Sequence, residues 1–422
     1  MNAALLVRGT RRPWHWRHLL LAPHRLGFFT AMVVLAAASL WWAAVQLQRS
    51  GAGYRLPAGL SPSLVHAAVM TFGFFPLFFS GFLFTAGPRW LGVPAPAART
   101  LAPALLAQLA GWLLWLAGSH LHVAIAAAGL AFALVGLCRV TALFWRLVAA
   151  SRAPDRVHAK AIGAALGVGC ASLGGLAIAT LAGADAIARL FVHSGLWGFV
   201  VVVCLTVANR MIPFFTACTT WKAGRWGPES VLVLMLGAAV FEAAAAWAGP
   251  WLGALAAWQI LRGVLELGVG AAVVALGIAW GLVRSLKFRL LAMLHLGLFW
   301  LGLALLLGGA SHLSGWITQA PVLPLAALHA LTMGCLGSLL LVMVTRVSCG
   351  HSGRSLVADD LVWGLFWLLQ AATLLRIAAA VPGWSTQNLL TATALVWTIV
   401  MLAWAIRYGS WYGRARADGR PG

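Results

Sequence analysis

Three histidines stand inside long apolar stretches of the chain, where an ionisable side chain is costly to bury. His66, His193 and His329 each lie near the start of such a stretch, and the segments between them are nearly equal, each long enough for four helices. Neutral imidazole in a dry bundle is the usual ligand of haem iron and also suits copper. Three histidines at similar depth therefore predict a haem or metal site, whereas any one alone could equally make a hydrogen bond between helices.

The sequences that follow these histidines are loosely alike: HAAVMTFGFF, HSGLWGFVVV and HALTMGCLGS. Met70 and Met333 follow His66 and His329 by four residues, so each pair would share one face of a helix. The thioether of either methionine could ligate copper, or its side chain could pack against a haem ring. The favoured interpretation is that both methionines fill gaps between helices.

Glu242 and Glu266 are the carboxylates placed deep in apolar stretches. Arg262 precedes Glu266 by four residues, which predicts an internal ion pair on one helix. Glu242 has no partner nearby in the sequence, so it could be protonated, pair with a distant arginine or carry protons. A structural role is favoured for these carboxylates. His312 is expected near the outer surface, in contact with water.

The composition explains why polar residues in apolar stretches are informative. Of 422 residues, 62% are apolar and 9% are charged, against about 25% charged in soluble proteins. This composition excludes a soluble enzyme, a disordered chain and a secreted disulfide scaffold, and it makes the lipid bilayer the first partner. The net charge of +21 is spread in short clusters between apolar runs. No nucleic-acid partner is therefore expected, and no pair of cysteines has a CxxC spacing.

The apolar runs predict an all-α polytopic membrane protein with about twelve transmembrane helices. The histidine spacing leaves open a pseudo-threefold arrangement of four-helix repeats. Residues 1–25 and 409–422 are predicted to be basic tails, and 26–408 a single transmembrane bundle. The predicted spans are 26–48, 63–87, 100–118, 121–147, 158–182, 186–208, 229–248, 252–283, 290–311, 321–346, 357–379 and 387–408. The eighth is long enough to tilt, kink or begin at the interface.

The placement of basic residues predicts the orientation. With a cytoplasmic N-terminus, the 29 Lys and Arg lie on the cytoplasmic side except for five arginines. Those five are Arg49, Arg55, Arg189, Arg262 and Arg376. The positive-inside rule therefore places both termini in the cytoplasm, and a bacterial inner membrane is the expected location.

Three blocks of sequence resemble the NnrS family of bacterial membrane proteins. They are GFLFTAGPRWLG (81–92), RMIPFFT (210–216) and HALTMGCLGSLLLVMVTRVSCGHSGRSL (329–356). The family is associated with haem, with copper and with the cellular response to nitric oxide, and its members have twelve helices. The resemblance thus implies haem b and copper as cofactors, and nitric oxide or a redox partner as an interacting species.

Carried over by position, the resemblance implies a fixed set of site residues. His66 and His329 would be the axial haem ligands, and His193 would line the site or bind copper. The other positions are Arg210, Arg346, His351 and Arg354, of which the GHSGR stretch could hold an anionic group such as phosphate or a haem propionate. The predicted topology puts GHSGR on the side opposite the histidine layer. No catalytic residue is assigned.

The chain departs from the family pattern in two places. The second helix of the family has a motif of the form H-x-H-E-M, where this chain reads His66, Ala67, Ala68, Val69 and Met70. The residue before Arg210 is Asn209 instead of Gly. These differences indicate a divergent member with fewer side chains able to bind a metal on the second helix.

Other classes of protein remain as alternatives at this point. The layout resembles the catalytic subunit of haem–copper oxidases, but the adjacent His pair and the H-x-H of the binuclear centre are absent. A proton-linked transporter would use Glu242 and the Arg262–Glu266 pair as its substrate site. A cofactor-free membrane scaffold would use neither these charged residues nor the three histidines.

Overall fold

The described part of the chain is entirely helical. The computed structural model describes residues 13–217, 228–280, 285–318, 322–323, 325–381, 383–384 and 386–419, without the side chains of 212–217 and 228. Within these residues there are twelve helices long and apolar enough to cross a membrane, and there are no strands. Helices that satisfy their own backbone are the expected solution in lipid, where no water is available to pair with N–H and C=O groups. The prediction of an all-α bundle with twelve spans is confirmed.

Each predicted span has a counterpart in the structure, and three spans are joined from two α-helices by a π-helix. In chain order the elements are the 3-10 helix η1 (Trp16–Leu21), α1 (Pro23–Arg49), α2 (Pro62–Ala68), the π-helix η2 (Val69–Gly73), α3 (Phe75–Leu91), α4 (Ala98–Leu121), α5 (Val123–Ala150), α6 (Val157–Leu181), α7 (Asp185–Gly195), the π-helix η3 (Leu196–Val201), α8 (Val202–Ala217), α9 (Pro228–Leu252), α10 (Ala256–Ala279), α12 (Arg289–Thr318), α13 (Ala326–His329), the π-helix η4 (Ala330–Gly337), α14 (Ser338–His351), α15 (Asp360–Ala378) and α16 (Thr386–Tyr412).

The eighth span is shorter than predicted. The apolar run 252–283 begins in the last residue of α9, and a turn over 253–255 separates it from α10 (Ala256–Ala279). The hydropathy pattern does not reveal this turn, because the residues of the turn are themselves apolar or glycine. Residues 281–284 lie outside the described part of the chain.

Four-helix repeats are visible in the order of packing. The repeats run from α1 to α5, from α6 to α10 and from α12 to α16. In each repeat the first span packs on the second: α1 packs on α3, α6 on α7 and α8, and α12 on α14. The last span of each repeat packs on the first span of the next, as α5 on α6, α10 on α12 and α16 on α1. The twelve spans therefore close into a ring of three repeats, which fits the nearly equal spacing of the histidines.

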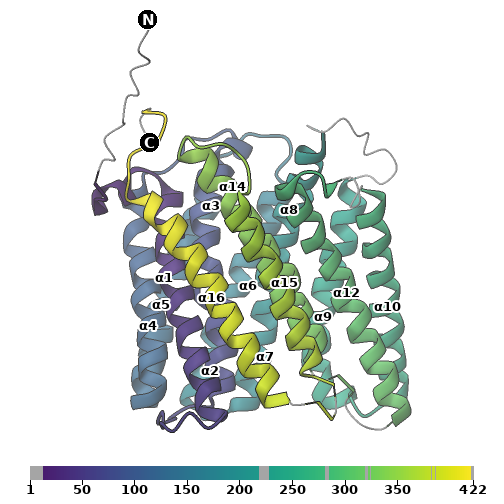
Figure 1. The fold of residues 1–422 in the computed structure, drawn as a ribbon. Helices are drawn as coiled ribbons and strands as arrows, with labels where there is room; N and C mark the ends of the chain where they lie inside the picture. Colours follow the sequence, from purple (N-terminus) through teal and green to yellow (C-terminus); the bar gives the residue numbers. More distant parts are fainter. Residues whose placement is uncertain are drawn as a thin grey trace, which may run out of the picture.

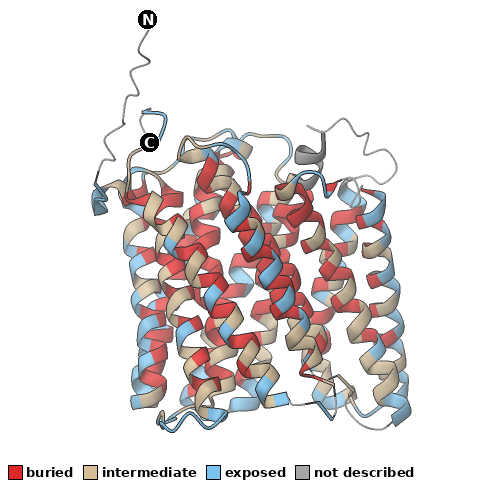
Figure 2. Cartoon of the chain, in the orientation of Figure 1, coloured by how far each residue is buried: buried red, intermediate tan, exposed pale blue. Residues whose placement is uncertain are grey.

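The second span of each repeat is the most buried span of that repeat. In an apolar 18-residue stretch of each span, the buried share is 89% for Pro62–Leu91, 61% for Asp185–Met211 and 72% for Ala326–His351, higher than for the other three spans of the same repeat. Figure 2 shows the alternation of buried and exposed residues along the outer helices, whose exposed faces are apolar and suit lipid. These three central spans carry His66, His193 and His329.

Both ends of the bundle can be defined without knowing the membrane orientation. Helix α1 begins and α16 ends at the same end of the bundle (Figure 1). We call this end the terminal face and the other end the opposite face. The prediction that the chain enters and leaves its spans on one side is consistent with this arrangement, and α1 and α16 extend a few residues into the predicted tails.

Close packing between α4 and α5 depends on glycine. A Cβ at Gly129 would lie 2.5 Å from the carbonyl oxygen of Gly111 and 2.7 Å from the amide nitrogen of Trp115. Both are backbone atoms, so the two helices would have to separate to admit a side chain. Small residues allow such close approach and drive association in lipid, where apolar burial contributes little.

We therefore predict that Gly129→Leu lowers the free energy of unfolding by about 1–3 kcal/mol, the usual cost of overpacking. The measurement is the midpoint of unfolding in a denaturing detergent titration. Gly167→Leu on α6 is the matched control, because a Cβ there meets nothing within 4 Å. Equal midpoints for the two variants would contradict the close contact.

Candidate functional site

Each central span changes from α-helix to π-helix just after its histidine. His66 is followed by η2 (Val69–Gly73), His193 by η3 (Leu196–Val201), and His329 directly by η4 (Ala330–Gly337). π-Helices are rare and occur frequently at functional sites. The repetition of this irregular geometry at three corresponding positions indicates that the region around the histidines is specialised.

His329 is held in an orientation that suits metal ligation. Its Nδ1 donates a hydrogen bond to the carbonyl oxygen of Leu325 at 2.9 Å. This bond fixes the proton on Nδ1 and leaves Nε2 as the free acceptor, which is the arrangement common in ligating histidines. Leu325 itself has a positive φ of 65°, an uncommon conformation for leucine that is found where the surroundings hold the backbone in place.

His66 is held by an aromatic neighbour from α1. Its ring stacks on Trp42 with centroids 3.9 Å apart and an interplanar angle of 17°. The guanidinium of Arg49 lies 5.5 Å from the same indole ring. Among the described residues, the buried Nδ1 of His66 has no hydrogen-bond partner. Burying a nitrogen without a hydrogen-bond partner costs free energy. A bound ligand or a hydrogen-bond partner would remove that cost.

The structure brings His66 and His329 together. The two rings are near enough to interact electrostatically, and Arg376 of α15 acts on both. Sequence reasoning missed Trp42, Arg49 and Arg376 as neighbours of this pair. The signal for both arginines was present, because they are among the few that break the positive-inside pattern. Trp42 gave no such signal in a chain with 23 tryptophans.

The methionines beside this pair are part of the apolar core. Met333 is buried, and the half-buried Met70 packs against the same core cluster. Their position agrees with the interpretation that they fill gaps between helices.

His193 has different neighbours. Its imidazole interacts electrostatically with Arg262 of α10 and with Arg189, one turn earlier on α7. Arg189 in turn donates hydrogen bonds to the hydroxyls of Ser61 and Ser63 at 3.2 and 2.9 Å, so α7 is tied to the start of α2. The part of the chain that the structure describes contains no group of three His, Cys, Asp or Glu able to hold a metal ion. The expectation that His193 binds copper stays a prediction.

The residues of the His66–His329 pair fit a haem. Both rings are partly buried on the most buried spans of their repeats, which favours neutral imidazole. Nε2 of His329 is free to ligate, and Nδ1 of His66 is a buried nitrogen without a partner among the described residues. Histidine nitrogen is a ligand of haem iron, and here the two histidines come from different repeats.

The other sequence-predicted residues gather at the terminal face. The guanidinium of Arg210 lies 5.0 Å from the ring of Trp90, and that of Arg354 lies 4.1 Å from the ring of Trp411. His351 ends α14, and its ring centroid is 4.5 Å from that of His24 in α1. The half-buried Arg346 lies on α14.

Cations are crowded at this face. Burial, and then the neighbouring Arg414 and Arg407, lower the pKa of the Arg354 guanidinium from its usual value. Arg89 and Arg416 act on His351, and Arg416 also donates to its carbonyl oxygen at 3.2 Å. The three blocks of the resemblance therefore meet here through Trp90, Arg210 and His351.

The terminal-face residues and the histidine pair cannot share one ligand. His329 and His351 stand at opposite ends of the 26-residue span Ala326–His351. At 1.5 Å per residue they are roughly 30 Å apart. Arg210, Arg346, His351 and Arg354 thus form a separate group, as the predicted topology required.

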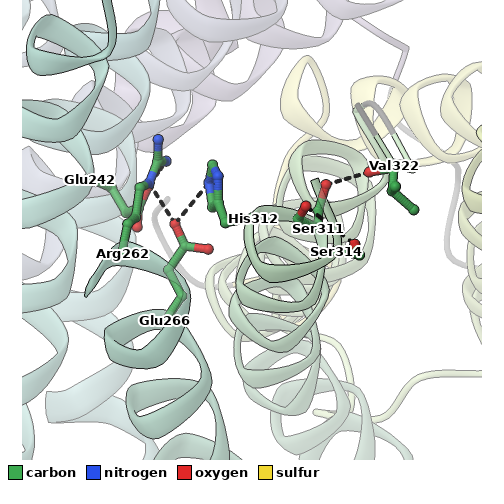
Figure 3. Close-up of polar contacts among 7 residues, drawn as sticks. All are labelled: Glu242, Arg262, Glu266, Ser311, His312, Ser314 and Val322. Carbon is green, nitrogen blue, oxygen red and sulfur yellow. Dashed lines mark hydrogen bonds and ion pairs between the residues drawn. The ribbon is translucent and has the colours of Figure 1, made fainter. Parts of the chain in front are cut away.

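A second polar cluster lies among α9, α10 and α12. Arg262 bridges two carboxylates, with its Nε 2.7 Å from Glu266 Oε1 and an Nη atom 2.6 Å from Glu242. His312 of α12 approaches the same Glu266 oxygen at 3.4 Å (Figure 3). The predicted Arg262–Glu266 pair is confirmed, and the structure supplies the distant arginine that Glu242 lacked. His312 is half-buried, and its side chain keeps 31% exposure beside Glu266.

The fold and sites described so far define a polytopic α-helical membrane protein built from three four-helix repeats around histidine-bearing central spans. The model of the NnrS protein family matches residues 18–416, nearly the whole chain. The chain therefore belongs to the NnrS family. A comparison with curated proteins finds no match.

Proposed function

We propose that this protein binds haem in the bacterial inner membrane and acts in the cellular response to nitric oxide. The observation that carries the haem assignment is that His66 and His329, which come from two repeats, lie near enough to interact electrostatically. Membership of the NnrS family supports the connection with nitric oxide.

The residues around the pair would prepare it for this ligand. The carbonyl of Leu325 keeps the proton of His329 on Nδ1, so that Nε2 presents its lone pair. The face of Trp42 fixes the ring plane of His66. Haem iron held by two imidazoles favours electron transfer, whereas an open axial position favours binding of nitric oxide. Arg376, which acts on both rings, would offset negative charge at the site.

The membrane orientation is part of the same proposal. The terminal face would lie in the cytoplasm, and the basic residues gathered there support this orientation through the positive-inside rule. The histidine pair would then lie in the outer half of the bilayer, and the termini in the cytoplasm.

The test is an optical spectrum of the purified protein, oxidised and reduced, with iron and copper analysis of the same sample. We expect a Soret band with about one iron per chain, and a shift of that band when nitric oxide is added. A double variant His66→Ala/His329→Ala, prepared identically, is the control for adventitious haem. A colourless wild-type protein without iron would contradict the proposal.

A further inference from the structure

The charged cluster of α9, α10 and α12 lies at the end of an apolar pocket. The pocket has a volume of about 360 Å³ and is lined by residues that include Phe241, Leu265, Val269 and Leu305 together with Glu242 and Glu266. This volume is within the range of small-molecule sites, which combine apolar walls with a few convergent polar groups. Leu265 is exposed on the lipid-facing side, so the pocket opens toward the membrane.

The two carboxylates are not fully satisfied by their partners in the cluster. Each glutamate is only 4% exposed. Within the described residues, Glu242 Oε1 and Glu266 Oε2 are buried and have no hydrogen-bond partner. Carboxylates at this depth are expected to be fully paired, because each unpaired buried charge costs several kcal/mol. The two carboxyl groups also lie within hydrogen-bonding reach of each other, which requires one shared proton between them. A cationic ligand would take the place of that proton.

The charges of the cluster give the sign of such a ligand. Two carboxylates carry −2, and Arg262 supplies +1. These three side chains together carry −1, in a medium where uncompensated charge is strongly disfavoured. One further positive charge is required, held as a proton in the empty site or as the cationic group of a ligand. His193 and Arg189, on α7, are the other charged or titratable groups that the structure places near Arg262.

We propose that this pocket binds a protonated amine carried on an apolar body, which enters from the lipid phase. The ammonium would donate to Glu242 Oε1 and Glu266 Oε2, and its apolar part would contact Phe241, Val269 and Leu305. Glu266 lies roughly 15 Å along α10 from its start at Ala256. That depth is below the headgroup layer, so a free hydrophobic amine fits the site and a lipid headgroup does not.

The experiment measures binding of radiolabelled n-octylamine to the full-length protein in nanodiscs, with empty nanodiscs subtracted. We expect saturable binding to about one site per chain, with release of a proton because the ammonium replaces the one held in the empty site. n-Octanol, which has the same apolar body and no charge, should not displace the amine at equal concentration. Equal displacement by octanol would show a non-specific apolar cleft and overturn the proposal.

Three variants separate the charge from the cavity. Glu242→Gln should weaken octylamine binding at least about tenfold, because one charge-assisted bond is lost. Gly237→Leu should also abolish binding without touching a charged group, since Gly237 lines the pocket and a Cβ there meets nothing within 4 Å. Glu229→Gln, an exposed carboxylate in the first turn of the same helix, should bind like the wild type.

The outcomes do not depend on the haem proposal. All three variants should keep the wild-type optical spectrum, and their unfolding midpoints show whether they fold. Wild-type affinity in both Glu242→Gln and Gly237→Leu would overturn the amine site. Loss of binding in Glu242→Gln with wild-type affinity in Gly237→Leu would also overturn it, because the ligand would then sit outside the pocket.

Discussion

Replacing Arg262 with methionine is expected to lower the free energy of unfolding by about 3–5 kcal/mol, the cost of removing one partner from a buried ion pair. Arg262 is the guanidinium that contacts both Glu242 and Glu266, at 2.6 and 2.7 Å. The side chains of the two glutamates are only 5% and 3% exposed. Methionine keeps the apolar stem of arginine, so the change removes charge and hydrogen bonds with little loss of packing. The midpoint of unfolding in a denaturing detergent titration measures the effect.

A second substitution shows whether charge is the cause. Adding Glu242→Gln to Arg262→Met should recover part of the lost stability, because one of the two stranded carboxylates is then neutral. Arg189→Met is the matched control on the same side of the bundle, since Arg189 donates to serine hydroxyls. If Arg189→Met and Arg262→Met cost the same, the bridge between the two carboxylates is not what stabilises the cluster.

Replacing His329 with alanine is expected to reduce haem occupancy more than about tenfold, since even residues that only support a ligand cost 10–100-fold when they are lost. His66→Ala should have the same effect, because the two rings would hold the same iron. The readouts are the Soret absorbance and the iron content per chain. Added imidazole should restore part of the Soret band in either variant by occupying the space of the missing ring.

His193→Ala provides the comparison for these variants. Its ring interacts with Arg262 and Arg189, and the structure does not join it to the His66–His329 pair. We expect this variant to keep its haem. Full haem content in both His66→Ala and His329→Ala would refute the ligand assignment, whereas loss of haem in all three variants would indicate a general folding defect.

The two polar sites of the bundle are connected through α12. His312 of the carboxylate cluster lies on α12, and the neighbouring Ser311 hydroxyl donates to the carbonyl of Val322, just before α13 (Figure 3). α13 carries His329. One packed helix and one loop contact therefore lie between the cluster and the histidine pair. The spectrum of Arg262→Met is worth recording for this reason.

The sequence by itself determined the spans, the even number of crossings and the depth of the polar residues. These features depend on local hydropathy and on the requirement that backbone groups in lipid be satisfied within each helix. The Arg262–Glu266 pair was equally accessible, because residues four apart share a helix face whatever the tertiary structure. The equal spacing of His66, His193 and His329 indicated the three repeats before any packing was known.

Only the tertiary structure decided which side chains meet. It stacked Trp42 on His66, joined Glu242 and His312 to the same polar cluster, and brought the imidazole of His193 within electrostatic reach of Arg262. Such contacts depend on how each helix is rotated about its axis and on which helices are neighbours in the ring. Hydropathy is averaged over whole helical turns, and the lipid-facing sides of these helices are as apolar as their buried sides. The sequence therefore carries little information about how each helix is rotated about its axis.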